Sequence, residues 1–156
     1  MAKEIERKFL VSGDSWRELA KGVRYTQGYL NSQKERTVRI RTIDDKAFLT
    51  IKGLTVGITR TEYEYEIPYA DCVAMLTQLA EQPIIDKKRY KIPYDGLVWE
   101  VDEFFGVNEG LIVAEVELSD ENQAFKKPDW VGEEISSDPK YFNSNLVANP
   151  YTTWKK

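Results

Sequence analysis

Charged and apolar residues alternate along the first strand-like segment of the chain, residues 2–11. Glu4, Glu6 and Lys8 stand at every second position, and Ile5, Arg7 and Phe9 alternate with them. A period of two is that of a β-strand, so the three charged side chains share one face. Taken alone, this segment is typical of an edge strand with a solvated face.

The same alternation recurs in six later segments of the chain. One face of a sheet therefore collects charged side chains from many strands, and the other collects Val, Ile, Leu and aromatic residues. The pattern predicts eight antiparallel strands, at about residues 2–11, 23–31, 35–44, 46–53, 59–67, 84–93, 97–105 and 111–119. Two short helices are predicted at Ser12–Leu19 and Tyr69–Gln82, and an irregular connection is predicted at Lys126–Lys140.

The predicted helices indicate which face of the sheet is inside. Val73, Leu76 and Leu79 are near helical spacing, and their side chains need an apolar surface to pack on. We therefore expect the apolar strand face to lie outward, under helices and loops, and the charged face to line a lumen. The predicted fold class is α+β, an eight-stranded antiparallel β-barrel with helices packed on the outside. It forms one domain over residues 1–156, and its closure removes unprotected strand edges.

A lumen lined by many charged side chains restricts what the barrel can hold. Removing an ion from water costs several kcal/mol even after the protein relaxes, so these groups cannot form a dry core. The interior is expected to be wet, neutralised by opposite charges and occupied by ionic ligands. Arg and Lys donate to phosphate oxygens, whereas carboxylate clusters suit hard divalent ions. The lining therefore predicts a site for a polyanion together with Mg²⁺ or Mn²⁺.

The ordered set of charged residues resembles a known family. Glu-x-Glu-x-Lys at 4–8 is followed, one element per predicted strand, by Arg39-x-Arg41, Lys52, Glu62-x-Glu64, Lys87-x-Arg89 and Glu115-x-Glu117. This set is similar to that of the CYTH family of triphosphate tunnel metalloenzymes, which includes class IV adenylyl cyclases and thiamine, inorganic and RNA triphosphatases. The resemblance extends from Met1 to about Glu117, and residues 141–146 resemble the family's closing helix. It implies an eight-stranded tunnel that binds a triphosphate through basic side chains and metal through glutamates.

Six glutamates are the candidate metal ligands. Glu4, Glu6, Glu115 and Glu117 lie on the first and last predicted strands, which closure of a barrel makes neighbours. We expect these four carboxylates to form the main metal-binding group. Two further residues, Glu62 and Glu64, bind a second ion or act as salt-bridge partners of the basic residues. Asp102 is a further candidate, and it and Glu100 are alternatively charge partners of nearby lysines.

The candidate phosphate-binding residues are basic and lie on the charged face. They are Lys8, Arg39, Arg41, Lys52, Lys87 and Arg89. The alternative is cross-strand pairing with the glutamates, which is compatible with phosphate binding because an empty site would hold such pairs. Tyr29 is a candidate hydrogen-bond partner of Lys8 or, alternatively, a core or rim residue. Arg60 is expected to be a solvated charge unless it reaches the tunnel mouth, and the tyrosines and Trp99 are expected on the barrel exterior.

The chain has no histidine, so the commonest general base is missing. A metal, a carboxylate or a lysine must then activate water. A lysine surrounded by other cations loses its proton more easily, which favours Lys52 or Lys87 over Lys8 as the base. The predicted catalytic residues are therefore Lys52, Lys87, Lys8 and Tyr29.

Composition excludes several classes of partner and compartment. The net charge of −4 argues against general nucleic-acid binding, and Cys72, the single cysteine, excludes an intramolecular disulfide framework. No apolar run has transmembrane length and no signal-like N-terminus is present, so we expect a cytoplasmic protein with no membrane partner. The pattern makes no prediction of oligomeric state.

Three functions fit the charged lumen. The first is metal-dependent hydrolysis of inorganic tripolyphosphate or a similar small triphosphate, favoured because the short chain shows no obvious extra pocket for a base or a thiazole. The second is an adenylyl cyclase or a thiamine or nucleoside triphosphatase. The third is a noncatalytic polyphosphate-binding module, which the set of carboxylates disfavours.

Overall fold

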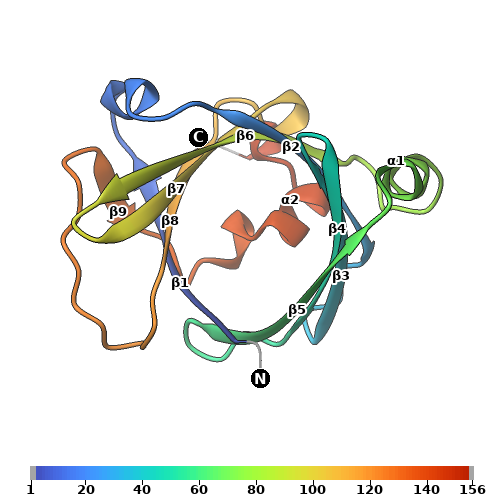
Figure 1. Ribbon diagram of the computed structural model, residues 1–156, viewed down its shortest axis with the longest axis horizontal. Coiled ribbons are helices and arrows are strands. Elements are labelled where there is room, and N and C mark those ends of the chain that lie inside the picture. The colour runs from blue at the N-terminus through green and yellow to red at the C-terminus, as the bar shows by residue number, and fades with distance from the viewer. Residues whose placement is uncertain (1–2, 155–156) are drawn as a thin grey trace.

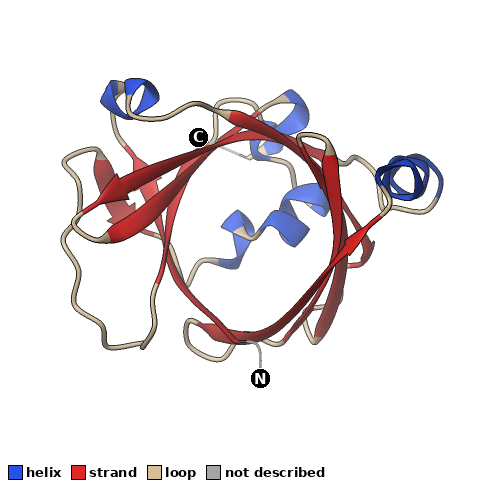
Figure 2. Cartoon of the chain, viewed as in Figure 1, coloured by secondary structure: helices blue, strands red, loops and turns tan. Residues whose placement is uncertain are grey.

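The computed structural model describes residues 3–154, and its strands curl into a closed antiparallel barrel (Figures 1 and 2). The strands are β1 (Lys3–Val11), β2 (Val23–Asn31), β3 (Arg36–Ile43), β4 (Lys46–Gly53), β5 (Thr59–Ile67), β6 (Ile85–Tyr94), β7 (Leu97–Phe104), β8 (Ile112–Glu117) and β9 (Val131–Glu134). The α-helices are α1 (Tyr69–Gln78) and α2 (Asn143–Ala148). Single 3₁₀ turns occur at Ser15–Glu18, Gly106–Asn108, Pro139–Tyr141 and Tyr151–Thr153.

The barrel consists of the eight predicted strands. Its order is β5-β4-β3-β2-β6-β7-β8-β1, and antiparallel pairing of β1 with β5 closes the ring. The closing seam pairs Lys3 with Thr61 and Ile5 with Thr59. β9 lies outside this ring, paired with the second half of β1. The predicted barrel and the predicted neighbourhood of the first and last strands are thus confirmed.

Three local predictions are wrong in detail. The first helical pattern forms only the 3₁₀ turn at Ser15–Glu18. The second helix ends at Gln78 rather than Gln82, where the N–H groups of Leu79 and Ala80 both bond to the Met75 carbonyl. Proline at position 83 also disfavours helix at the residue before it. The connection predicted as irregular contains β9, whose four residues are too short to show an alternation.

The largest apolar cluster lies on the outer face of β1, β7 and β8. It is centred on Trp99, which is fully buried and contacts the rings of Phe9, Phe125 and Trp130. Trp16, in the first 3₁₀ turn, covers the same face together with the connection that leads to β9. The apolar strand face therefore points outward under covering segments, as the pattern predicts.

Helix α1 covers a second part of the outer surface, over β3 and β4. Cys72 and Leu76 of the helix pack on Ile40 and Ala47. Gly28 on β2 lies under the same helix, because a Cβ there would come within 3.0 Å of Leu76 Cδ2 in the helix and within 2.9 Å of the Ala80 Cβ just after it. Outward strand positions are therefore apolar or small where the helix approaches.

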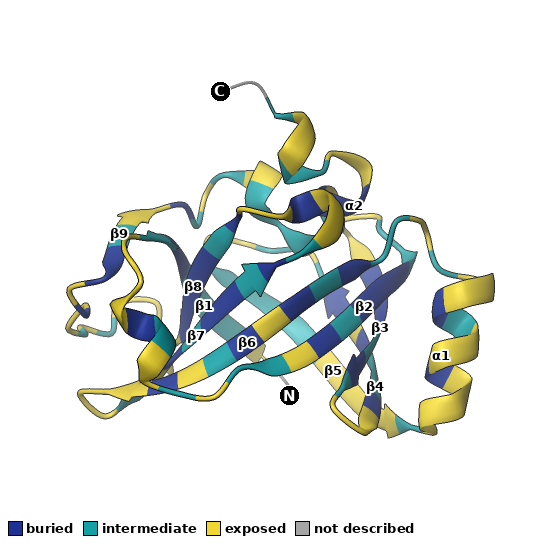
Figure 3. Cartoon of the chain, turned by 90° about the horizontal axis from the view of Figure 1, so that it is seen from above, coloured by how far each residue is buried: buried dark blue, intermediate teal, exposed yellow. Residues whose placement is uncertain are grey.

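Helix α2 lies across one end of the barrel instead of along its side (Figures 1 and 3). Its residues Leu146 and Val147 are buried with Tyr29, Phe104 and Val113. The barrel is thus apolar under α2 and charged further along its axis. Within the described part of the chain, none of the helices has the length and apolar character needed to cross a bilayer.

We predict that Gly28→Ala destabilises the fold by about 1–3 kcal/mol, because an added methyl forces α1 away from β2. The measurement is the free energy of unfolding in urea. Gly53→Ala is the matched control, since a Cβ at Gly53 meets only the Thr61 Cβ at an ordinary 3.6 Å. Equal stability of the two variants would contradict the proposed close packing of α1.

Candidate active site

The lumen contains a cavity of about 250 Å³, to which all eight barrel strands contribute side chains. Every site residue predicted from the sequence, apart from the further candidate Asp102, lines it: Glu4, Glu6, Lys8, Tyr29, Arg39, Arg41, Lys52, Glu62, Glu64, Lys87, Arg89, Glu115 and Glu117. The strand register explains this convergence, because directly opposed residues on antiparallel strands share a face. Lys52, for example, is opposite both Thr37 on β3 and Glu62 on β5.

One ionic cluster spans the closing seam of the barrel. The Lys52 ammonium lies 3.1 and 3.0 Å from the two carboxylate oxygens of Glu4 and 3.3 Å from Glu62. The expectation that Lys52 is surrounded by cations is therefore wrong, since β1 and β5 each bring a carboxylate beside it. For Arg60 the exception stated above holds, because its Nε donates to Glu4 at 3.3 Å and its side chain lines the cavity.

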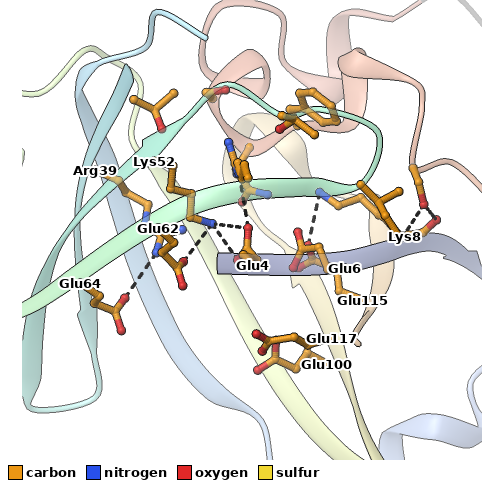
Figure 4. Close-up of a pocket in the computed structure, with 18 of the residues that line it drawn as sticks. Glu4, Glu6, Lys8, Arg39, Lys52, Glu62, Glu64, Glu100, Glu115 and Glu117 are labelled. Carbon is orange, nitrogen blue, oxygen red and sulfur yellow. Dashed lines mark hydrogen bonds and ion pairs between the residues drawn. The ribbon is translucent and has the colours of Figure 1, made fainter. Parts of the chain in front are cut away.

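A second cluster joins β1 to β8 (Figure 4). The Lys8 ammonium lies 3.6 Å from a Glu115 oxygen and donates to the Tyr141 carbonyl at 3.3 Å. The candidate hydrogen bond between Tyr29 and Lys8 is not among the contacts of the described residues, and Tyr29 is instead buried in the apolar cluster under α2, which is the alternative given above. The reason is topological, because β2, which carries Tyr29, pairs with β3 and β6 and not with β1.

The carboxylates of this second cluster crowd one another. Burial, together with the negative charges of Glu115 and Glu4, raises the pKa of Glu6 well above its usual range. Burial acts to raise the pKa of Glu115 as well, but the nearby Lys8 ammonium and a hydrogen bond with Glu6 lower it well below its usual range. Glu117 is affected in the same sense as Glu6, since burial and then Glu4, among other carboxylates, raise its pKa.

Arg39 and Arg41 face the cavity from β3. Arg39 donates to the Thr50 hydroxyl at 3.2 Å, and both guanidinium groups approach one Glu64 oxygen, at 3.7 and 3.4 Å. The Nε atoms of both arginines are nevertheless buried without an acceptor. Burial, and then the positive charges of Arg39 and Arg89, lowers the pKa of Arg41 to about 10.

A third cluster is centred on Asp102, which is fully buried. Lys87 donates to Asp102 at 2.8 Å and to the Asn143 side-chain oxygen at 3.0 Å. Arg89 forms a bidentate pair with the same carboxylate, at 2.7 and 2.9 Å. Both Asp102 oxygens are therefore engaged by cations, so the structure favours the charge-partner interpretation of this residue over metal ligation.

Lys87 has the environment expected of a lysine that titrates near neutral pH. Its side chain is only 1% exposed. Burial lowers its pKa to about 7, although Asp102 opposes this effect, and the charge of Arg89 adds to it. Lys8 differs, because burial is outweighed by Glu115 and Glu6, which raise its pKa.

Some lining residues were not predicted as site residues. Arg60 has the same parity as Glu62 and Glu64, so alternation alone could have assigned it to the lumen. The tyrosines were expected outside, but Tyr25 lies opposite Lys87 and contacts Arg41 and Arg89 inside the barrel. Ser136, Phe142, Asn143 and Ser144 come from the segment that carries α2, and no strand periodicity marks them.

Most carboxylates of the lumen are paired with basic side chains rather than gathered around one point. Between residues 3 and 154, no group of three or more Asp, Glu or Cys side chains is already gathered closely enough to hold a metal ion. The raised pKa values of Glu6 and Glu117 nonetheless show an excess of neighbouring negative charge. A divalent cation would relieve this excess, so the donor set fits a hard metal ion.

A closed antiparallel barrel with guanidinium and ammonium groups facing carboxylates defines a tunnel-type protein that binds ionic ligands in its lumen. The unpaired buried N–H groups suit an anionic ligand, and the crowded carboxylates suit a cation bound beside it. The chain belongs to the CYTH domain family, whose model matches residues 2–151.

Relatives with established names align over nearly the whole chain. An inorganic triphosphatase of Acetivibrio thermocellus is 56% identical over 156 residues, which is 100% of both chains. An inorganic triphosphatase of Nitrosomonas europaea is 38% identical over 151 residues, covering 94% of this chain and 97% of that one. A crystal structure described as an inorganic triphosphatase has a TM-score of 0.68 and 34% identity, covering 94% of this chain and 95% of that one.

We predict that Asp102→Ala lowers the free energy of unfolding by about 3–5 kcal/mol, because it leaves Lys87 and Arg89 buried without their shared anion. Urea unfolding measures the change. Glu103→Ala is the control, since Glu103 lies on the opposite face of β7 and pairs with Arg17 outside the barrel, and it should cost less than about 1 kcal/mol. A similar cost for both variants would contradict the central role of the Asp102 cluster.

Proposed function

We propose that this chain is a metal-dependent triphosphatase that hydrolyses a phosphoanhydride bond of inorganic tripolyphosphate in the barrel lumen. We also propose that residues 1–156 form a single domain of this kind. The observation that carries the proposal is the pair of Arg39 and Arg41, whose side chains line the cavity and whose buried Nε donors have no acceptor. An unsatisfied buried donor is costly, and phosphate oxygens are acceptors suited to guanidinium groups. The names of the close relatives support the same activity.

The basic side chains are the proposed phosphate-binding residues. Arg39, Arg41 and Arg89 offer planar donors, which suit phosphate oxygens better than a point charge does. Lys8 and Lys52 would add ammonium groups along the same lumen, and Lys87 would add one only in its protonated form. In the structure these basic side chains are paired with carboxylates. On binding, the oxygens of a triphosphate would replace the carboxylates as partners of the basic side chains, and a metal ion would become the partner of the carboxylates.

The glutamates are the proposed metal ligands. Glu6, Glu115 and Glu117 are crowded on the β1–β8 side, and Glu4 lies beside them. Family membership implies a divalent metal, and oxygen-only ligands favour Mg²⁺ or Mn²⁺. Such an ion supplies positive charge at the phosphate oxygens and lowers the pKa of water. Glu62 and Glu64 remain candidates for a second ion, with Lys52 and the β3 arginines as their present partners.

Lys87 is the proposed general base. In its neutral form its Nζ would accept a proton from the attacking water as the water oxygen bonds to the terminal phosphorus and the anhydride P–O bond breaks, which leaves orthophosphate and pyrophosphate. Asp102 and Asn143 hold the Nζ in place from β7 and α2. The arginines would neutralise charge on the transferred phosphoryl group. Lys52 is less suited as a base because Glu4 and Glu62 surround it.

The purified protein with tripolyphosphate and Mg²⁺ or Mn²⁺ should release orthophosphate and pyrophosphate, and chelation by EDTA should abolish release. ATP and thiamine triphosphate are the comparison substrates, expected to react at least about tenfold more slowly because the cavity is lined mostly by charged and polar groups. Orthophosphate release is the measurement. Cyclic nucleotide and pyrophosphate formed from ATP would instead establish a cyclase. Binding of tripolyphosphate without turnover would establish the noncatalytic module.

We predict that Lys87→Arg lowers kcat by about 10²–10⁴-fold, because arginine keeps the positive charge but cannot act as a base at neutral pH. In the wild type, kcat/KM should rise as the pH rises through about 7, since a lysine with that pKa is neutral only above it. Steady-state kinetics from pH 5.5 to 9, a range of about three to four units around the transition, measure both effects.

The control for this prediction is Lys88→Arg. Lys88 is the next residue on β6, is exposed and points away from the lumen, so this variant should keep the wild-type rate and pH profile. Retention of wild-type kcat by Lys87→Arg would exclude Lys87 as the base.

A further inference from the structure

Tyr25 is a buried aromatic residue inside the barrel that is not among the residues lining the cavity. It lies on β2 opposite Lys87 and Ile43 and is only 3% exposed. Two guanidinium groups lie over its ring, that of Arg41 with 5.1 Å and that of Arg89 with 4.9 Å from the central carbon to the ring centroid. These arginines come from β3 and β6, the strands on either side of β2.

We propose that Tyr25 is a positioning residue that holds the Arg41 guanidinium beside Arg89, so that the Arg41 N–H groups not bound to Glu64 are available to the oxygens of the triphosphate. The proposal rests on the proposed function, because it concerns how the same lumen binds its substrate. Among the described residues the Tyr25 hydroxyl has no hydrogen bond, and both arginine contacts are made to the ring, so the ring is the relevant group.

The geometry of a guanidinium group explains why a ring serves here. The face of an aromatic ring attracts the flat face of a guanidinium, whereas the N–H donors point outward in the guanidinium plane. A carboxylate in the same place would engage those donors itself. Arg41 illustrates the consequence, since its Nε is buried with no acceptor and, within residues 3–154, its one ion pair is the 3.4 Å approach to Glu64.

The ring also offsets repulsion between the two cations. Arg89 is one of the charges that lower the pKa of Arg41, so the two guanidinium groups are close enough to repel each other. Asp102 fixes Arg89 from the other side, but Arg41 has no comparable bidentate partner among its contacts. Loss of the ring should therefore release Arg41 more than Arg89.

The test compares three substitutions at Tyr25. Tyr25→Phe keeps the ring and should keep KM for tripolyphosphate within about twofold, whereas Tyr25→Leu and the more adaptable Tyr25→Met should raise KM about tenfold with a smaller change in kcat. Calorimetric titration with tripolyphosphate should show the same loss of affinity. Rescue by Phe, together with the unequal effect on KM and kcat, separates positioning from a structural role.

Tyr90→Leu is the matched control, because Tyr90 packs edge-on against Trp16 outside the barrel. It should lower the melting temperature as Tyr25→Leu does, without raising KM. Wild-type KM in both Tyr25→Leu and Tyr25→Met, equal losses in all three Tyr25 variants, or the same KM increase in Tyr90→Leu would overturn the proposal. If the wild type binds tripolyphosphate without hydrolysing it, the proposed function fails, and the titration alone then decides the role of Tyr25.

Discussion

The structure depends on the closure of a barrel in which every strand except β2 turns charged side chains inward. In each antiparallel pair, directly opposed residues share a face, so one alternating strand places its charges beside those of the next. Pairing of β1 with β5 completes the ring, and Glu4 of the first strand then meets Lys52 and Arg60 from the other side. Without that seam, the charged face would be one solvated side of an open sheet.

Burial of these charges produces three environments in one lumen. Asp102 is saturated by Lys87 and Arg89, whereas Glu6 and Glu115 crowd each other. Arg41 is only partly paired: its guanidinium lies over the Tyr25 ring, and its Nε has no acceptor. A buried ion pair is weak evidence for added stability, but groups left incompletely paired are suited to bind ligand ions. The distribution of partners therefore separates structural charges from those proposed to hold metal and phosphate.

The alternation along the strands predicted much of the fold and the site. It placed Arg39, Lys52 and Glu115 in the lumen, because a period of two fixes the face of each residue once one face is known. It did not predict the neighbours of Lys52, which were expected to be cations and are carboxylates. Neighbours across a barrel depend on strand order and register, and a single strand's pattern records neither. Asn143 was missed for a related reason, since its place beside Lys87 comes from the folding of the C-terminal segment over the barrel end.

The sequence by itself determined which side chains share a face, that a charged face had to be enclosed, and the family that the chain resembles. These properties are local, since they follow from the two-residue period of a strand and from the cost of exposing apolar surface. The tertiary structure decided which opposite charges pair, which lysine loses its hydration, and that Tyr25 lies between two arginine-bearing strands inside the barrel. Those outcomes depend on distances between residues far apart in the chain, and only closure of the barrel sets such distances.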